Sequence, residues 1–220
     1  MSQRTISFVP GEFYHVYNRG TDKRTIFQNE ADWRRFQLLL RIGNTHQSKK
    51  VRDIFADHPD PYAAEPTDPL VAIGAYCLMP NHFHILVTPL VEEGVSHFMQ
   101  KIGTSYVSAF NARNERTGSL FEGKFKARYV DHDQYLKYLF AYIHLNPVKL
   151  MQPDWKERGI ADPNQAFAYA SAYRYSSLQD YLGVVRPEGT IIARQHFPDY
   201  FSSASSIKDE IFEWLTYDQD

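Results

Sequence analysis

Two apolar runs separated by Pro80-Asn81 constrain the fold more than any other stretch of the sequence. Residues 70–79 (LVAIGAYCLM) and 82–88 (HFHILVT) are each long enough for a buried strand, and a Pro-Asn pair between such runs is typical of a tight turn. The stretch therefore predicts a β-hairpin inside a sheet. His82 and His84 stand two residues apart in its second strand, where a core strand would ordinarily carry apolar side chains.

The elements around this hairpin predict the rest of the domain. Residues 13–19 (FYHVYNR) are rich in aromatic and β-branched residues and predict a strand that Gly20 ends. Apolar spacing predicts helices over 29–42 and 91–114, and residues 119–131 predict one or two short strands. A further helix, capped by Asp131 or Asp133, should end near Asn146-Pro147. This order predicts an α+β fold, a ferredoxin-like antiparallel sheet with helices packed on it.

One domain accounts for most of the chain. We expect residues 1–150 to form it, with the proline-rich segment 44–69 as an irregular insertion. Residues 151–220 are loop-rich, with short helices expected at 173–182 and 206–216, and should form a C-terminal loop and helix extension that packs on the same domain.

Composition indicates a cytoplasmic protein with a local positive face. A single cysteine excludes an internal disulfide, and no apolar run is long enough to span a membrane. The net charge of −2 argues weakly against nucleic-acid binding, but the charges are segregated. Residues 1–52 hold ten Lys and Arg against four acids, whereas residues 53–100 hold seven acids and no Lys or Arg. Such segregation favours either a basic binding face or ordinary solvated surfaces.

His82 and His84 form the first chemical motif. Side chains at positions i and i+2 of a strand project from the same face, so the two imidazoles should stand side by side while Phe83 points to the other face. Two imidazoles on one face suit a divalent metal. The alternative is a pair of structural histidines on a half-exposed strand.

Tyr142 and Asn146 form the second motif, one helical turn apart. The Asn146 side chain supplies an oxygen that could complete a metal site, and Tyr142 would then lie beside that site. A phenol is a weak nucleophile at neutral pH and needs a strongly electrophilic target, such as a metal-polarised phosphodiester. The set suggests covalent phosphoryl transfer with Mg²⁺ or Mn²⁺ rather than a closed zinc site.

Four segments resemble a known family. The stretches FYHVYNRG, YCLMPNHFHILV, YIHLNPVKL and YRYSSLQDYLG occur in the order found in the REP-associated tyrosine transposases, IS200-like members of the single-tyrosine HUH transposase superfamily. The resemblance implies a ferredoxin-like catalytic domain that cuts single-stranded DNA at repetitive palindromic hairpins. It also implies that cutting leaves a 5′-phosphotyrosine and a free 3′-OH.

The resemblance assigns roles to single residues. His82 and His84 match the metal-binding pair, Tyr142 matches the nucleophile, and Asn146 stands where the superfamily has a third ligand. Two departures are present: His144 replaces a glutamate common in the family, and the insertion 44–69 is long. His144 should point away from the line of Tyr142 and Asn146.

Two basic segments are candidates for DNA contacts. Lys124, Lys126 and Arg128 alternate along one predicted strand face, and basic and aromatic residues interleave near the first strand. This second group comprises Arg19, Lys23 and Arg24 with Tyr14 and Tyr17. Cations that follow a backbone beside aromatics that stack on bases suit single-stranded nucleic acid. Alternating Lys and Arg is equally the ordinary outward face of a sheet, where it protects an edge.

Three functions are compatible with these patterns. The first is a metal-dependent endonuclease and strand transferase that acts on single-stranded or hairpin DNA, as a monomer or homodimer and without a membrane partner. The second is a regulatory protein that binds repeat DNA without catalysis. The third is a metal-dependent phosphodiesterase that uses water, with Tyr142 in the core.

Overall fold

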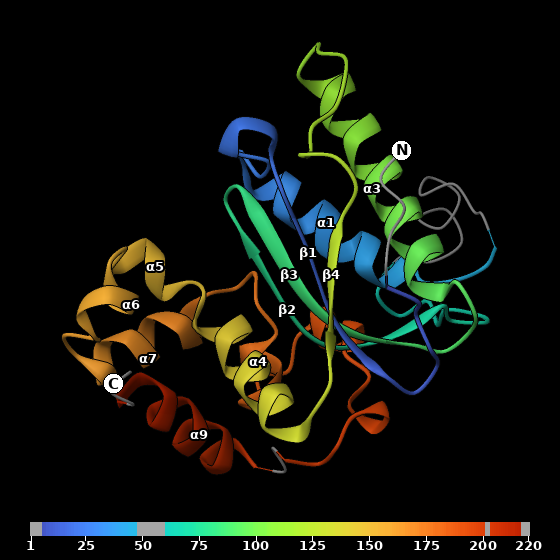
Figure 1. The fold of residues 1–220 in the computed structure, drawn as a ribbon. Helices are drawn as coiled ribbons and strands as arrows, with labels where there is room; N and C mark the ends of the chain where they lie inside the picture. The colour runs from blue at the N-terminus through green and yellow to red at the C-terminus, as the bar shows by residue number, and fades with distance from the viewer. Residues whose placement is uncertain (1–5, 48–59, 201–202, 217–220) are drawn as a thin grey trace.

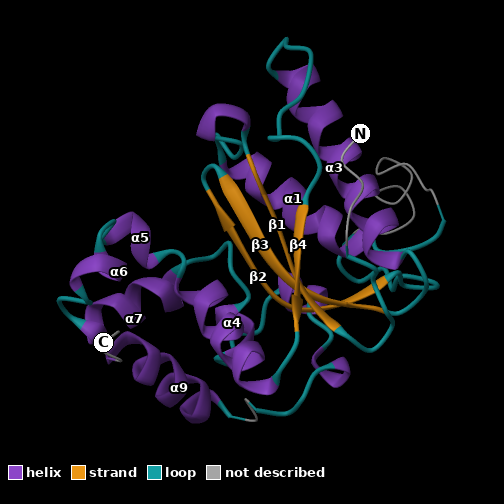
Figure 2. Cartoon of the chain, in the orientation of Figure 1, coloured by secondary structure: helices purple, strands orange, loops and turns teal. Residues whose placement is uncertain are grey.

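In the part of the chain that the structure describes, four antiparallel strands form the centre of the molecule (Figures 1 and 2). The structure is a computed structural model that describes residues 6–47, 60–200 and 203–216. The strands β1 (Phe13–Arg19), β2 (Val71–Met79), β3 (His82–Pro89) and β4 (Lys126–Val130) lie in the order β2-β3-β1-β4. Helix α1 (Glu30–Ile42) connects β1 to β2, and α3 (Gly94–Arg113) connects β3 to β4. This is ferredoxin-like connectivity, so the predicted α+β fold is confirmed.

The predicted hairpin is the most buried part of the sheet. Every residue of β2 is buried, and β3 is buried from Phe83 onward. The turn between them is held from outside the hairpin, because the Pro80 carbonyl accepts from the Ile26 backbone N–H at 2.8 Å and the Asn81 carbonyl accepts from Gly20 at 2.8 Å. Both strand ranges agree closely with those predicted from the apolar runs.

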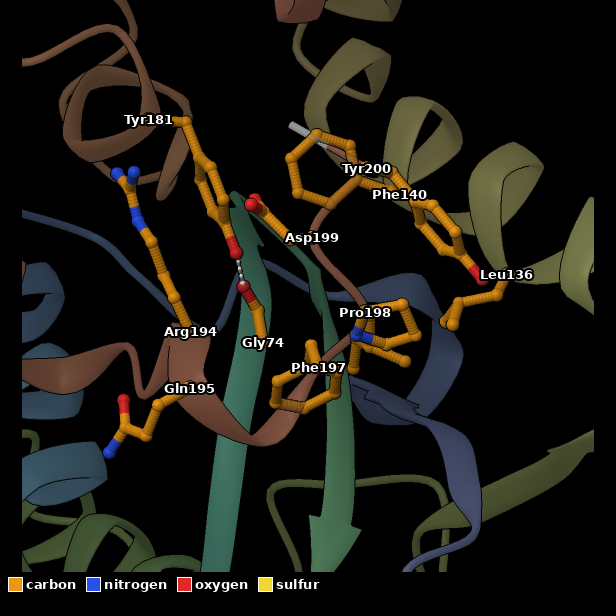
Figure 3. A pocket seen from close by; sticks show the side chains of 11 residues that line it. Gly74, Leu136, Phe140, Tyr181, Arg194, Gln195, Phe197, Pro198, Asp199 and Tyr200 are labelled. Atoms are coloured by element: carbon orange, nitrogen blue, oxygen red, sulfur yellow. Dashed lines mark hydrogen bonds between the residues drawn. The ribbon is translucent and has the colours of Figure 1, made fainter. Parts of the chain in front are cut away.

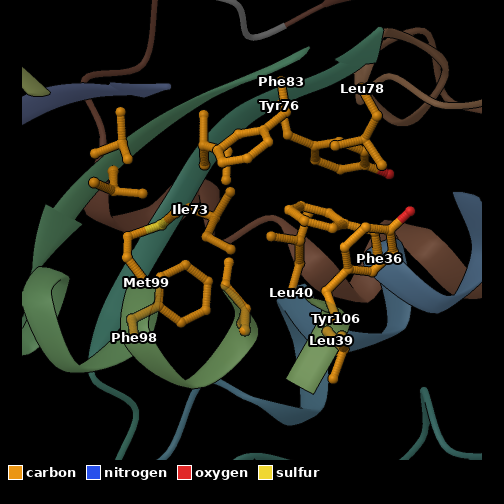
Figure 4. Close-up of a cluster of buried hydrophobic side chains, with 14 of the residues drawn as sticks. Phe36, Leu39, Leu40, Ile73, Tyr76, Leu78, Phe83, Phe98, Met99 and Tyr106 are labelled. Atoms are coloured by element: carbon orange, nitrogen blue, oxygen red, sulfur yellow. The ribbon is translucent and has the colours of Figure 1, made fainter. Parts of the chain in front are cut away.

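Helices α1 and α3 cover one face of the sheet (Figure 1). Asn29 caps α1 by accepting a hydrogen bond from the Asp32 N–H, and the buried carboxylate of Asp32 is paired with Arg113 of α3. Between these helices and the sheet lies a core of large apolar and aromatic side chains (Figure 4). Figure 4 labels Phe36, Leu39, Leu40, Ile73, Tyr76, Leu78, Phe83, Phe98, Met99 and Tyr106.

Helix α4 (Asp133–Leu145) covers the opposite face. It packs its apolar stripe, which includes Leu139 and Ile143, against β2 and β3. The helix is capped by His132, whose Nδ1 accepts from the Tyr135 N–H at 2.9 Å, so the predicted cap by Asp131 or Asp133 is wrong. The reason is local: His132 has the extended backbone of a cap, whereas Asp133 is already the first helical residue.

The C-terminal region is more helical than predicted. It contains α5 (Val148–Met151), α6 (Trp155–Arg158), α7 (Pro163–Ala172), α8 (Leu178–Tyr181) and α9 (Ala204–Thr216). Short 3₁₀ turns occur in this region at Pro187–Ile191 and Arg194–His196, and another follows β1 at Thr21–Lys23. The helix expected over 173–182 is reduced to α8, while α7 starts ten residues earlier at Pro163. Asp162 caps α7 by accepting from two backbone N–H groups. Helix α9 lies close to the predicted range.

Residues after α7 pair with the outer edge of β2. The Leu78 N–H donates to Tyr175 at 2.9 Å, and the Ser177 N–H donates to Tyr76 at 3.0 Å. Farther along, the Tyr181 hydroxyl donates to the Gly74 carbonyl at 2.6 Å beside a cavity of about 380 Å³ (Figure 3). This segment therefore gives hydrogen-bond partners to an edge that would otherwise be open.

The ends of the insertion 44–69 are tied together by Asn44. Its side-chain oxygen accepts from the Leu70 and Val71 N–H groups, each at 3.0 Å, and its amide donates to the Val71 carbonyl at 2.7 Å. The middle of the insertion, residues 48–59, lies outside the described residues. None of the described helices is long and apolar enough to cross a membrane.

His144 points away from Tyr142, as predicted. Its side chain is completely buried, and its Nε2 lies 2.8 Å from the Ser177 hydroxyl. Burial lowers the pKa of His144 to about 3, so the imidazole is neutral in the folded protein at neutral pH.

This buried imidazole should make the protein sensitive to acid. Between pH 6.5 and about 3 the unfolded chain protonates His144 and the folded chain does not, so the free energy of unfolding falls as pH falls. We expect His144 alone to contribute about 1.4 kcal/mol per pH unit in this window. Urea unfolding at pH 7, 6 and 5 should show a shallower pH dependence for His144→Gln than for the wild type. Equal slopes would contradict the prediction.

Candidate active site

Strand pairing assembles one row of side chains across the sheet. Tyr17 of β1 lies opposite His84 on one side and Lys126 on the other. Directly opposed residues of antiparallel strands share a face of the sheet. The register therefore places the Tyr17 ring between the second histidine and a cation, on the face that α4 covers. Arg19 lies opposite His82 in the next row.

This face contains a cavity of about 360 Å³. His82, His84 and Tyr142 line it together, although some sixty residues separate the histidines from the tyrosine in sequence. Four of the predicted DNA-binding residues line the same cavity, so the fold brings the proposed chemistry and the proposed contacts together. The remaining lining residues are Tyr17, Asn18, Arg19, Lys23, Asn81, Phe83 and Lys126.

The two imidazoles of the motif stand close together at a steep angle. Their ring centres are 5.1 Å apart and their planes are inclined by 86°. His82 Nδ1 lies 2.6 Å from the side-chain oxygen of Asn81, whose amide nitrogen donates to the Lys23 carbonyl. Because an amide oxygen only accepts, Nδ1 of His82 carries the proton and its Nε2 keeps a lone pair. Burial, followed by the charge of Lys149, lowers the pKa of His82 to about 4.

His84 is held by a third histidine. Its Nδ1 lies 2.8 Å from Nε2 of His15, and the two rings are stacked with centres 5.0 Å apart. Burial, followed by the positive charge of Arg128, lowers the pKa of His15 to about 4. His15 is therefore neutral at neutral pH and can share one proton with His84.

Tyr142 meets the histidines edge-on. Its ring centre is 5.4 Å from that of His84 and 6.1 Å from that of His15. Burial raises the pKa of the Tyr142 phenol above its ordinary value, so the hydroxyl is protonated at neutral pH. The Lys149 ammonium lies 5.9 Å from the centre of the Tyr142 ring.

Asn146 offers an oxygen donor near these groups. Its side chain is buried, and its amide nitrogen donates to the Tyr142 carbonyl at 2.7 Å. The side-chain oxygen is also buried and accepts no hydrogen bond from the described residues. The Asn146 side chain is near enough to His82 and Tyr142 to influence the pKa of each. A buried oxygen of this kind is a natural partner for a cation.

The donor set fits a divalent cation bound by two imidazole nitrogens and one amide oxygen. Within the described residues, His, Cys, Asp and Glu form no cluster of three or more that could hold a metal ion. Asn146 is therefore the candidate for a third protein ligand, and such a site would have positions for water or phosphate oxygens.

The other predicted DNA-binding residues lie outside the cavity. Arg128 lies 4.6 Å from the centre of the Tyr135 ring, and Arg24 is paired with Asp22. Tyr14 is buried on the opposite face of the sheet, where its hydroxyl accepts from the Val9 N–H at 2.8 Å. The Tyr14 side chain therefore does not reach the row that contains Tyr17.

Lys124 also differs from its predicted position. β4 begins at Lys126, so Lys124 precedes the strand and does not continue its alternation. It lines a separate cavity against α3, together with residues such as Ser96 and Thr104. The predicted row of three cations is thus a pair on the strand and one cation elsewhere.

Sequence reasoning missed two residues beside the cavity. His15 has the same strand parity as Tyr17, and this parity could have placed it on the active face. Lys149 follows Asn146 by three residues, but Pro147 was expected to end the helix. The chain instead resumes a helical turn at Val148, which keeps Lys149 near Tyr142.

The segment that holds the two histidines and Tyr142 resembles a known class of protein. Residues 67–146 match the model of the family described as transposase IS200 like, a range that includes His82, His84, Tyr142 and Asn146. This segment is therefore similar to an IS200-like transposase domain, and the resemblance seen in the motifs is confirmed.

One solved structure that the chain resembles is a REP-associated tyrosine transposase bound to a REP hairpin. The two have a TM-score of 0.53 at 13% sequence identity, over 86% of this chain and 90% of that one. At this identity the likeness concerns the fold. None of the curated proteins matches the chain.

Proposed function

We propose that this protein is a metal-dependent single-strand DNA endonuclease and strand transferase that acts on palindromic repeat hairpins. The observation that carries the proposal is the cavity in which Tyr142 meets His82 and His84. A nucleophile, a pair of metal-binding nitrogens and a buried amide oxygen have no evident joint purpose in a protein that only binds DNA.

The chemical step is a transfer of a DNA phosphoryl group to the phenolic oxygen of Tyr142. The phenolic oxygen forms a bond to phosphorus while the bond between phosphorus and the 3′ oxygen breaks. The phenol loses its proton and the departing oxygen gains one, so the products are a 5′-phosphotyrosine and a free 3′-OH. Because Tyr142 is protonated at rest, its proton must leave as the new bond forms.

His82, His84 and Asn146 are the proposed ligands of Mg²⁺ or Mn²⁺. When bound, the ion would polarise a phosphate oxygen and offset the charge of the reacting phosphate. The burial that keeps His82 neutral also keeps its Nε2 lone pair available at neutral pH.

Hairpin or single-stranded DNA is the proposed substrate. Lys23, Lys126 and Arg19 supply cations at the rim of the cavity, and Tyr17 supplies a ring on which a base could stack. The similar solved structure, which holds a REP hairpin, supports a substrate of this class.

The two alternatives make different demands on Tyr142. A water-using phosphodiesterase needs no tyrosine at the cavity and is disfavoured because Tyr142 lines it next to His84. A regulatory binding protein would bind the hairpin and leave it uncut.

Replacing the nucleophile should separate cutting from binding. Tyr142→Phe removes the attacking oxygen and keeps the ring, so covalent product should fall below detection while the hairpin affinity changes by less than about twofold. The assay uses hairpin oligonucleotides from the protein's own genome, labelled at the 3′ end, with Mn²⁺ and denaturing gels. A labelled adduct that persists in Tyr142→Phe would remove Tyr142 from its role. Tyr138→Phe, one turn away on α4, is the matched control.

Removing a proposed ligand should weaken metal binding. For His82→Ala and Asn146→Ala we expect Mn²⁺ affinity to fall by at least about 10- to 100-fold, the loss that follows removal of even a supporting residue. Electron paramagnetic resonance of free Mn²⁺ measures this directly. His144→Gln is the control, because His144 faces Ser177 and not the cavity. Undiminished DNA cutting in the presence of a chelator would overturn the metal dependence.

Two lysines two positions apart provide a test of the DNA surface. Lys126 lines the catalytic cavity and Lys124 lines the cavity against α3, so Lys126→Ala should weaken binding to all sequences and Lys124→Ala should not. The slope of log affinity against log salt should decrease in magnitude by about 0.7 to 0.9 for Lys126→Ala alone. Fluorescence anisotropy across a salt series measures both quantities. Equal losses in the two variants would show that the cavity does not select the DNA path.

A further inference from the structure

The third histidine of the site, His15, has no role in the chemistry derived so far. It lies on β1 opposite Leu86, two pairs along from the opposed residues Tyr17 and His84. This diagonal relation lets its ring reach across to the ring of His84. His15 is nearly buried, stacked on His84 and 4.9 Å from the Tyr17 ring, so its position is determined by packing.

The contact between the two rings has a chemical consequence. A separation of 2.8 Å between two imidazole nitrogens requires that one carries the proton and the other accepts it. If His84 Nδ1 donates, then Nε2 of His84 has the lone pair that a metal needs. If His15 donates, His84 carries its proton on Nε2 and cannot bind a metal through that atom.

We propose that His15 is a positioning residue whose Nε2 accepts a hydrogen bond from the Nδ1–H of His84 and thereby holds His84 in its metal-binding tautomer. This rests on the proposed metal role of His84. The supporting observation is the parallel with His82, whose Nδ1 is likewise hydrogen-bonded away from the metal position by the oxygen of Asn81. Outer groups that hold a ligand histidine in this way are a general feature of metal sites.

His15 is not a fourth ligand. The nitrogen that it presents, Nε2, is directed at His84, and His15 does not line the cavity that His82, His84 and Tyr142 share. Its effect on a metal would therefore pass through His84. A glutamine could replace it, because the side-chain oxygen of glutamine reaches about as far as imidazole Nε2 and accepts a hydrogen bond, whereas leucine has no acceptor.

The first test measures the tautomer without metal. In ¹⁵N-labelled wild-type protein at pH 7.5, long-range ¹H–¹⁵N spectra should place the His84 proton on Nδ1. His15→Gln should keep it there, and His15→Leu should move it to Nε2. A wild-type His84 protonated on Nε2 overturns the proposal, and so does an Nδ1 proton that persists in His15→Leu.

The second test measures Mn²⁺ affinity in the same three proteins. His15→Leu should bind about 10- to 100-fold more weakly than the wild type, while His15→Gln should stay within about threefold. Equal weakening in both variants would make His15 a ligand or a packing residue and overturn the proposal. If the wild type shows the expected tautomer but binds no Mn²⁺, the proposed metal site fails while the tautomer assignment stands. Circular dichroism melts identify any variant that does not fold, and the wild-type tautomer needs no variant.

Discussion

The site depends on the hydrogen-bond ladders of β1, which lies between β3 and β4. These ladders set Tyr17 between His84 and Lys126, and His15 diagonal to His84. The same register sends Tyr14 and Val16 into the core under α1 and α3. Because both faces of the strand are committed, a slip by one residue would bury the polar face and expose the apolar one. The packing of the core therefore specifies the geometry of the site.

Burial determines the charge of the cavity. The imidazoles of His15 and His82 are neutral because desolvation disfavours their charged forms, and the Tyr142 phenol is neutral for the same reason. The positive charges that act on these imidazoles come from Lys149, Arg128 and Arg19. Neutral donors beside these cations favour an anionic group such as a phosphodiester over a neutral ligand.

Much of this arrangement could be predicted from local pattern. The hairpin around Pro80-Asn81, the first strand and the spacing of Tyr142 and Asn146 all follow from short-range rules. What could not be predicted depends on how the strands pair and pack. Tyr14 and Tyr17 are three residues apart on a strand, so their side chains face opposite sides of the sheet. Only the packing of the core shows which of the two sides is buried. The start of β4 separates Lys124 from Lys126. Lys149 is near Tyr142 because the chain resumes a helix after Pro147.

The contact between His144 and Ser177 joins helix α4 to a segment that lies outside the residues matched by the family model. The matched region ends at Asn146, yet the helix bearing Tyr142 is anchored through Ser177, which also binds the backbone of β2. Residues 175–177 and Ala193 supply the hydrogen bonds along the edge of β2. A fragment cut after Asn146 would keep every residue of the proposed chemistry and lose the support that orients Tyr142. The packed unit that surrounds the candidate site is thus longer than the segment that matches the family model.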